Sequence, residues 1–365
     1  MKWTKLSLVA ALAVSSAVAG GDVVAPVVAA ASQPATTIDG KLVGYYYSEN
    51  SEGSLFGKDS SGISSAVTLN VSHKFTENIT GNVSAVGFAG LMNNDYAAKW
   101  ISFTPADEEA GAYLNVANIT ATYGDNTFIL GRQLINTPMV TGYDWLLAES
   151  SFNAYTVVNT SFENITLVGS YLTQFRSLYD GDNQFADLAG DNFAFGASYS
   201  KDFDASAWYY NVDALDYTEV YIDGSKKMGD VTLSAQYVDS KSSSDATRDG
   251  SAFGVKVATT LGGFDLEAAY VDVKDGVGYA GDYDGLYTSM WMGIASAEAG
   301  SSYKVAASTD LAGISTTVAY AEYDRGSETN VILGYDFSDA ISLGAIYSDS
   351  VDYDETVELI ASYKF

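Results

Sequence analysis

Few residues in this sequence have the types and spacing that covalent chemistry needs. His73 is the only histidine among 365 residues, and the chain has no cysteine. General acid–base or nucleophilic catalysis would need a serine or a carboxylate marked as the partner of His73. No motif marks one, and no glycine-rich phosphate loop of useful spacing occurs. The sequence therefore predicts a protein that is not an enzyme, with no catalytic residue and no cofactor.

Carboxylates offer a second kind of chemistry, the binding of a cation through oxygen. Asp180, Asp182, Asp187 and Asp191 could supply such ligands to a divalent cation. Their spacing matches no metal-binding loop, so we expect a solvated acidic loop and no metal site. Asn-x-Ser/Thr triplets begin at Asn70, Asn78, Asn82, Asn118, Asn159 and Asn164. A polar strand face produces the same spacing, and we favour that origin over glycosylation.

Basic residues among apolar ones form the third group of candidates. Arg132, Arg176, Lys256 and Lys304 lie in segments where polar and apolar residues alternate. The alternation places Arg176 and Lys256 on the polar face, whereas Arg132 shares its face with apolar neighbours. A basic side chain facing lipid at mid-bilayer costs roughly 2–4 kcal/mol. If these segments cross a membrane, the four residues face a water-filled lumen or lie at its rim.

The segments that carry these charges are predicted strands. Period-2 alternation recurs with hardly a break, and helical periodicity is scarce. The alternation predicts eighteen strands, at 37–48, 62–75, 79–91, 111–123, 126–135, 151–160, 163–176, 190–202, 204–214, 216–227, 230–240, 249–261, 263–275, 301–311, 313–324, 327–338, 340–349 and 353–365.

The connections between these strands fall into two alternating classes. One class is tight, and three of its members follow an aromatic residue: Phe75, Phe162 or Phe337. The other class is generally longer and rich in Asp, Gly and Ser: 49–61, 92–110, 136–150, 177–189, 241–248 and 276–300. Short turns at one end with long loops at the other indicate a transmembrane antiparallel β-barrel with periplasmic turns and external loops. The aromatic residues would then lie at the periplasmic membrane interface.

The N-terminal residues are typical of an exported protein. Lys2 and Lys5 precede a short apolar run and a small-residue stretch, which predicts a secretory signal peptide over residues 1–19. We expect a mobile lead at 20–36 and one transmembrane β-barrel domain over 37–365. The apolar run is too short to span a bilayer as a helix.

The final strand alternates up to the last residue of the chain. Tyr363 and Phe365 lie on one of its faces, and this ending resembles the signal by which the barrel-assembly machinery recognises Gram-negative outer-membrane proteins. The last strand of a barrel must also pair with the first, because backbone polar groups in lipid need partners.

The amino-acid composition limits the kinds of partner that the protein can bind. The chain holds 27 Tyr, a residue suited to membrane interfaces. There are 46 acidic and only 18 basic residues, which argues against nucleic acid. We expect outer-membrane lipid and lipopolysaccharide around the barrel, and an acidic lumen and loops that attract cations.

A local motif resembles a known family. Residues 130–138 read LGRQLINTP, residues 142–147 read GYDWLL, and Ser151 precedes Phe152. This arrangement is similar to the third loop of OprD-type porins, the substrate-selective branch of Gram-negative porins. The resemblance implies an 18-stranded barrel, a third loop at 136–150 folded inward as a constriction, passive diffusion of small hydrophilic solutes, and a trimer. Family members that take carboxylates line one wall with Arg and Lys, of which this chain has few.

The resemblance and the charges together give a pore hypothesis. Asp144 and Glu149 of the third loop would face the strand cations across the constriction, where opposed charges filter ions. We expect a passive porin in the cell outer membrane with a modest preference for cations. The alternative is a non-conducting surface, adhesin or structural barrel.

Overall fold

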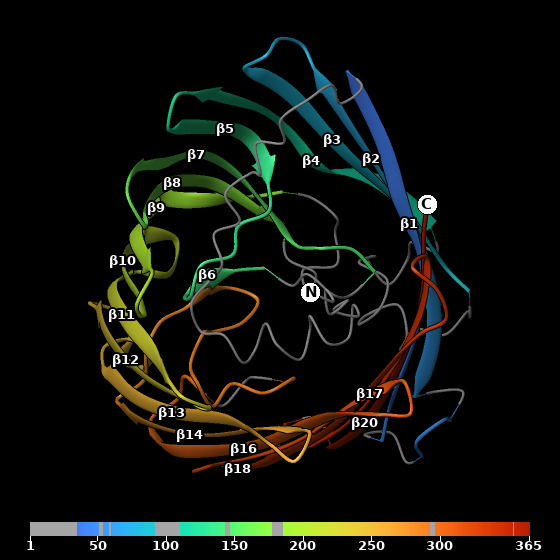
Figure 1. Ribbon diagram of the computed structural model, residues 1–365, viewed down its shortest axis with the longest axis vertical. Helices are drawn as coiled ribbons and strands as arrows, with labels where there is room; N and C mark the ends of the chain where they lie inside the picture. Colours follow the sequence, from blue (N-terminus) through green and yellow to red (C-terminus); the bar gives the residue numbers. More distant parts are fainter. Residues whose placement is uncertain are drawn as a thin grey trace.

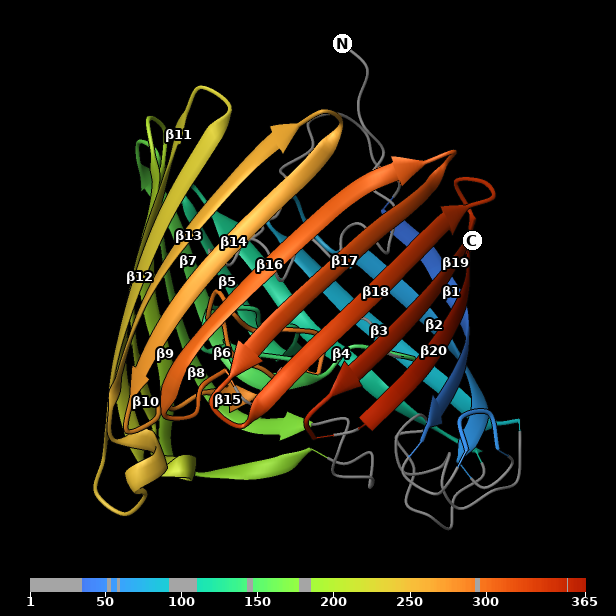
Figure 2. The same ribbon diagram turned by 90° about the horizontal axis from the view of Figure 1, so that it is seen from below.

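A computed structural model describes residues 35–50, 54–57, 60–91, 110–142, 147–176, 185–292, 296–352 and 354–365. Over these residues, one sheet of eighteen antiparallel strands closes on itself. It closes because β1 (Thr36–Glu49) pairs with β2 (Ser61–Lys74) on one side and with β20 (Asp354–Lys364) on the other. Figure 1 looks through the resulting ring, and Figure 2 shows the tilted strands from the side.

The remaining barrel strands follow in chain order, and each pairs with the next. They are β3 (Ile79–Gly90), β4 (Ala110–Tyr123), β5 (Asn126–Gln133), β7 (Ser151–Phe162), β8 (Ile165–Arg176), β9 (Ala186–Ser200), β10 (Asp204–Val212), β11 (Tyr217–Met228), β12 (Val231–Ser242), β13 (Ser251–Leu261), β14 (Phe264–Lys274), β16 (Gly300–Leu311), β17 (Ile314–Tyr323), β18 (Gly326–Asp336) and β19 (Ile341–Ser350). Two 3-10 turns lie at the long-loop end of the barrel: η1 (Asp213–Leu215) in the short connection between β10 and β11, and η2 (Ala246–Arg248) between β12 and β13.

The predicted all-β barrel is confirmed, and each of the eighteen predicted strands is present. The largest difference is at β9, which begins at Ala186, whereas alternation predicted a start at 190. The early residues of β9 are acidic and look like a loop in the sequence. They are strand because a register shift lets Asp187 pair with Gln174 of β8. No helix among the described residues is long and apolar enough to cross a membrane.

The strands have apolar outer faces and a mixed inner wall. In β13, Phe253 and Val255 point outward and are 51% and 41% exposed, whereas Ala252 and Lys256 point inward and are 1% and 8% exposed. The same arrangement, with exposed apolar side chains on the outer face and buried side chains on the inner face, recurs around the sheet. Broad apolar exposure of this extent is costly in water and is the arrangement that suits lipid.

The closing seam depends on a glycine. The backbone amide of Gly40 donates to the carbonyl of Phe365 at 2.9 Å, and that of Phe365 donates back at 3.0 Å. A Cβ on Gly40 would lie 2.5 Å from the Thr68 carbonyl oxygen and 2.6 Å from the Phe365 ring. The absence of a side chain at residue 40 therefore lets the last aromatic residue cover the seam. Tyr363 and Phe365 are both about half exposed, and their recognition by assembly machinery stays a prediction.

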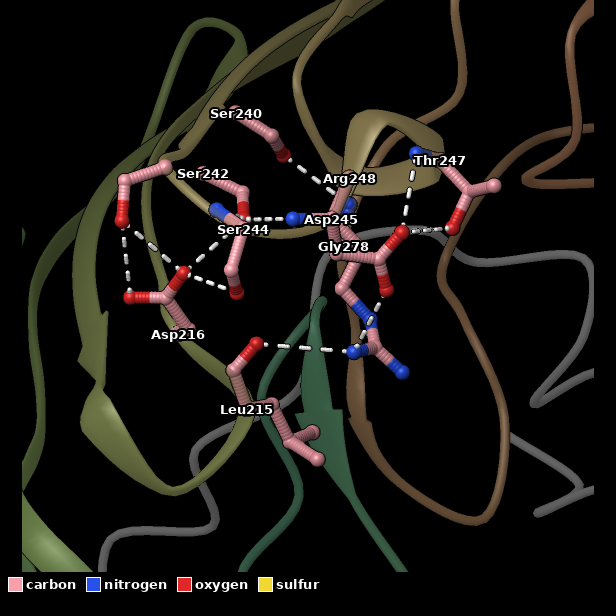
Figure 3. A network of polar contacts seen from close by, with 10 residues as sticks. Leu215, Asp216, Ser240, Ser242, Ser244, Asp245, Thr247, Arg248 and Gly278 are labelled. Carbon is pink, nitrogen blue, oxygen red and sulfur yellow. Dashed lines mark hydrogen bonds and ion pairs between the residues drawn. The ribbon is translucent and has the colours of Figure 1, made fainter.

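Polar contacts fix the long-loop end of β10–β13 (Figure 3). Asp216 accepts hydrogen bonds from Ser242, Ser243 and Ser244. These bonds, that of Ser244 above all, lower the pKa of the exposed Asp216 carboxyl. Arg248 of η2 forms an ion pair with Asp245 at 3.0 Å. The network holds the external connections together above the barrel wall.

Candidate constriction site

The described parts of the connection between β5 and β7, residues 134–142 and 147–150, fold into the barrel. Its first part holds β6 (Val140–Thr141), and Met139 and Val140 pack with the inward side chains of β7–β14, at 0% and 2% exposure. Its last part packs Leu147 and Ala148 among inward residues of β1–β3. Because its two parts reach different arcs of the wall, this loop spans the lumen (Figure 1). We call it the first inward loop.

A second connection, between β14 and β16, also folds inward. The sequence predicted a long external connection at 276–300; the structure has this long connection between β14 and β16 but folds it into the barrel, which the sequence did not predict. The loop's β15 (Ala280–Gly281) pairs in parallel with β6 inside the barrel (Figures 1 and 2). The Ala280 amide donates to the Met139 carbonyl, and the Asp282 amide donates to the Thr141 carbonyl, both at 2.9 Å. We call residues 275–292 and 296–299 the second inward loop.

Glycine allows the two inward loops to approach so closely. Gly281 has a φ of +101°, and a Cβ there would lie 1.8 Å from the Thr141 carbonyl oxygen. A larger residue would clash with the backbone of the first loop. The second loop also carries Tyr287, Met290 and Trp291, which is an unusual content for an exposed loop. That apolar content was the signal in the sequence for its burial.

Inward carboxylates on the barrel wall anchor the second inward loop. The Met292 amide donates to Glu328 of β18 at 2.8 Å, and the Trp291 indole donates to Glu358 of β20 at 2.7 Å. Tyr45 of β1 donates to the other oxygen of Glu358. Neither glutamate was predicted from the sequence as a site residue. An acid that alternates with apolar residues in a barrel strand was the available signal.

Lys256 and Lys304 lie beneath the second inward loop. Both face inward and form ion pairs with Glu267, at 3.7 and 3.1 Å. Lys304 donates to the Ser289 carbonyl at 3.3 Å, and the Lys256 ammonium lies 4.8 Å from the centre of the Tyr287 ring. Their side chains are only 7% and 5% exposed. The structure thus places both lysines on the lumen side of the wall, where the loop covers them.

Glu149 and Arg176 meet where the first inward loop returns to the wall. The Glu149 carboxylate forms a 2.7 Å ion pair with Lys41 of β1, with both side chains about one-fifth exposed. Arg176 donates to the Glu149 carbonyl at 3.0 Å, and its guanidinium lies 4.1 Å from the centre of the Tyr113 ring. Asp282 of the second loop is close enough to act electrostatically on Arg176. This cluster joins both inward loops to β1 and β8.

Arg132 lies apart from that cluster. It shares the outward face of β5 with Phe128 and Leu130, close to the end where the first inward loop begins. Its guanidinium donates to the Leu114 carbonyl at 2.9 Å and packs on the Phe185 ring at 4.1 Å. Of the two placements that the sequence left open, lumen or rim, this geometry favours the rim. Asp144 lies outside the described residues.

His73 has a structural environment. It lies near the tight-turn end of β2, within 2.7 Å of the Thr36 hydroxyl, and its ring contacts Phe75 edge-on at 4.9 Å between centroids. Within the described ranges, no group of three or more His, Asp or Glu side chains is arranged to hold a metal ion. The proposed acidic loop residues Asp180 and Asp182 lie outside those ranges.

Among known proteins, solved structures have a similar fold, whereas no sequence family or curated sequence matches. No protein-family model matches the chain, and no curated protein matches it. The Acinetobacter baumannii protein OccAB2 superposes with a TM-score of 0.77 at 12% identity, covering 90% of this chain and 98% of that one. The Pseudomonas aeruginosa outer membrane protein OpdK gives 0.75 at 16%, with 90% and 98% covered. A BenF-like porin from Pseudomonas fluorescens gives 0.74 at 14%, also with 90% and 98% covered.

These neighbours are OprD-type porins, so the fold implied by the sequence motif is confirmed. At such low identity the likeness shows the barrel architecture over nearly the whole length of each neighbour. It does not carry over their solutes. One solved form of OpdK holds vanillate, which is a property of that protein.

Proposed function

We propose that this protein is a porin of the outer membrane through which small hydrophilic solutes diffuse passively. The observation that carries the proposal is a closed eighteen-stranded barrel whose outer face is apolar and whose interior holds two inward loops. A lipid-facing apolar belt around a polar wall is the structure of a membrane channel. The solved porins with the same fold support the assignment.

The surroundings follow from this placement. Lipid and lipopolysaccharide would cover the outer face, and the barrel-assembly machinery would insert the chain. The turn residues Phe75, Phe162 and Phe337 are 62%, 56% and 60% exposed, as expected at the periplasmic interface. Association into a trimer remains a proposal from the resemblance.

We further propose that the channel prefers cations modestly. The acidic residues exceed the basic ones by 46 to 18. Among the basic residues of the wall, Lys41, Lys256 and Lys304 are each paired with a carboxylate. Paired cations attract anions weakly, so the acidic excess would set the sign of the potential.

Planar-bilayer recording tests the proposal. The purified protein should insert as a channel with a steady ohmic conductance, and a salt gradient should give a reversal potential of the sign for cation preference. A clear anion preference would contradict the selectivity while leaving the porin assignment intact.

The second candidate is a barrel that serves at the surface without conducting, as an adhesin or structural protein. The two inward loops favour it, because they occupy much of the lumen. A correctly folded protein that inserts but never conducts would establish this alternative.

A further inference from the structure

A row of hydrogen-bonding side chains runs across the inner wall of β1–β4. We call it the amide row; its members are Asp39, Asn70, Ser72, Asn82, Asn118 and Thr120. All six are in the half of the barrel nearer the tight turns, below the point where the first inward loop meets β1–β3.

Direct hydrogen bonds join the members from strand to strand. The Ser72 hydroxyl donates to the Asn82 amide oxygen at 2.8 Å. The Asn82 amide nitrogen donates to Asn118 at 2.9 Å and to Thr120 at 3.2 Å. Asn118 in turn donates to the Arg132 carbonyl at 2.9 Å. The amides are therefore held in fixed orientations rather than free to rotate.

Strand alternation places the row on the lumen side. Val67 and Leu69 of β2 and Ile119 of β4 are 43%, 40% and 50% exposed and lie on the outer face. The members of the row occupy the alternate positions, and Ser72, Asn82 and Asn118 are directly opposite one another in the strand register. The row is only partly buried, so lumen water and solutes can reach it.

The row has hydrogen-bonding capacity but no positive charge. It contains five neutral side chains and one carboxylate, Asp39, which accepts from Asn70 at 2.8 Å. Lys41, the nearest inward residue above Asp39, is already paired with Glu149. Lys74 lies below the row, at the turn end of β2. A wall of this kind offers donors and acceptors to hydroxyl groups, but the charge of Asp39 opposes a carboxylate.

We propose that the amide row is a binding track for neutral polyhydroxylated solutes, such as sugars, and that it does not select carboxylates. This inference rests on the porin function proposed above and names its solute class. Aromatic side chains on the same strands support it, because Tyr45 of β1 faces inward above the row and Tyr113 of β4 packs partly buried against the cluster of Tyr45 and its neighbours. Aromatic rings present apolar faces that suit the C–H faces of a sugar.

Single-channel recording with a neutral trisaccharide tests the track. The trisaccharide should produce resolved interruptions of the current, and a polyethylene glycol of the same hydrodynamic size should not, because it has only its two terminal hydroxyl groups and otherwise ether oxygens that cannot donate. Both probes are neutral, so the comparison is independent of ion selectivity. Equal interruption by both probes would overturn the inference.

A double variant locates the binding. Asn82→Val with Asn118→Val should shorten each interruption about fivefold, the factor for one net hydrogen bond of about 1 kcal/mol. The matched control is Asn159→Val. Asn159 bonds Asn126 at 2.8 Å in the same way, but it lies on the outer face of β7 together with Tyr155 and Val157. Unchanged interruptions in the double variant would place the sugar elsewhere and refute the track.

Folding of the variants is checked separately. If the double variant does not form a heat-modifiable barrel, Ser72→Ala removes one hydroxyl of the row with little change in volume and gives the same test. A wild-type protein that does not conduct refutes the porin function itself. A wild-type protein that conducts potassium chloride but does not distinguish the trisaccharide from the glycol refutes only the sugar track.

Discussion

At the scale of single residues, the Lys41–Glu149 ion pair bears most directly on ion selectivity. The sequence predicted Glu149 as an acid opposed to cations across the constriction, whereas the structure joins its carboxylate to an ammonium at 2.7 Å. The pair is nearly neutral as a unit. Removing either partner would leave a single partly exposed charge in the lumen, where a unit charge acts on a passing ion with about 1 kcal/mol at 4 Å in water.

The first prediction is that substitutions of the two partners have opposite effects. Glu149→Gln should lower the potassium-to-chloride permeability ratio by up to about fivefold at low salt, and Lys41→Gln should raise it. Reversal potentials measure both. The double variant should return close to the original ratio, and a double variant no closer to it than either single variant would show that the pair does not act as a unit. Asp144→Asn should also lower the ratio if that acid faces the lumen.

Asp284 of the second inward loop predicts a pH effect. Burial raises the pKa of its carboxyl to about 6, although Ser296 and the Leu286 amide donate hydrogen bonds to it at 2.5 and 2.9 Å. The pKa of Asp284 is higher when the second inward loop is docked against the barrel wall than when the loop is free. The docked state is therefore most stable below about pH 4, where the carboxyl is protonated in both states. This stabilisation of the docked state falls as the pH rises through about 6, and the total loss of free energy is about 3 kcal/mol.

The second prediction follows from this sign. Current fluctuations caused by undocking of the second inward loop should be more frequent at pH 7.5 than at pH 5. Asp284→Asn should remove the difference and make the channel quiet at both values. Single-channel noise analysis gives the measurement. An equal pH dependence in the variant would assign the effect to another group.

At the scale of elements, the second inward loop determines how much of the lumen is filled. It bonds to the first loop through backbone groups and to β18 and β20 through Glu328 and Glu358. The third prediction is that replacing residues 279–292 by a short glycine–serine link raises single-channel conductance. Shortening the external connection 243–249 serves as the control and should leave it unchanged. A conductance unaffected by the first deletion would mean that ions pass elsewhere.

The closing strand gives the fourth prediction. Gly40→Val should impair barrel closure, because its side chain would collide with the Thr68 carbonyl and the Phe365 ring. Gly44→Val in the same strand is the control, since nothing lies within 4 Å of a Cβ there. Removing Phe365 should lower assembly as well. The folded fraction, read from gel mobility before and after boiling, should fall only for the Gly40 and Phe365 variants.

At the scale of the whole molecule, the fifth prediction is a barrel that resists denaturants. All eighteen barrel strands are paired on both sides, so the barrel sheet has no free edge. The mature protein should be almost wholly β in detergent and should migrate differently on gels before and after heating. A soluble monomer that is stable without detergent would contradict the membrane placement of the barrel.

Sequence alone predicted the strands well and the site only partly. Strand alternation is a local signal, and turns such as Gly124–Asp125 end strands by local chemistry. The inward course of the second inward loop depends on contacts with β6, β18 and β20, which are distant in the chain. For the same reason, the sequence placed Lys256 on the polar face but did not show that Tyr287 and Ser289 would cover it.

The parallel contact between β6 and β15 has a consequence for how such a channel diversifies. Its hydrogen bonds join main-chain atoms of residues 139–141 and 280–282, and main-chain bonds are insensitive to most side-chain replacements. Gly281 is the exception, because its neighbour leaves no space for a Cβ. Natural mutation or mutagenesis in the laboratory can therefore change the side chains around the opening while the pairing of β6 with β15 is kept. Variant proteins could then pass different solutes without any change in the backbone pairing of the two inward loops.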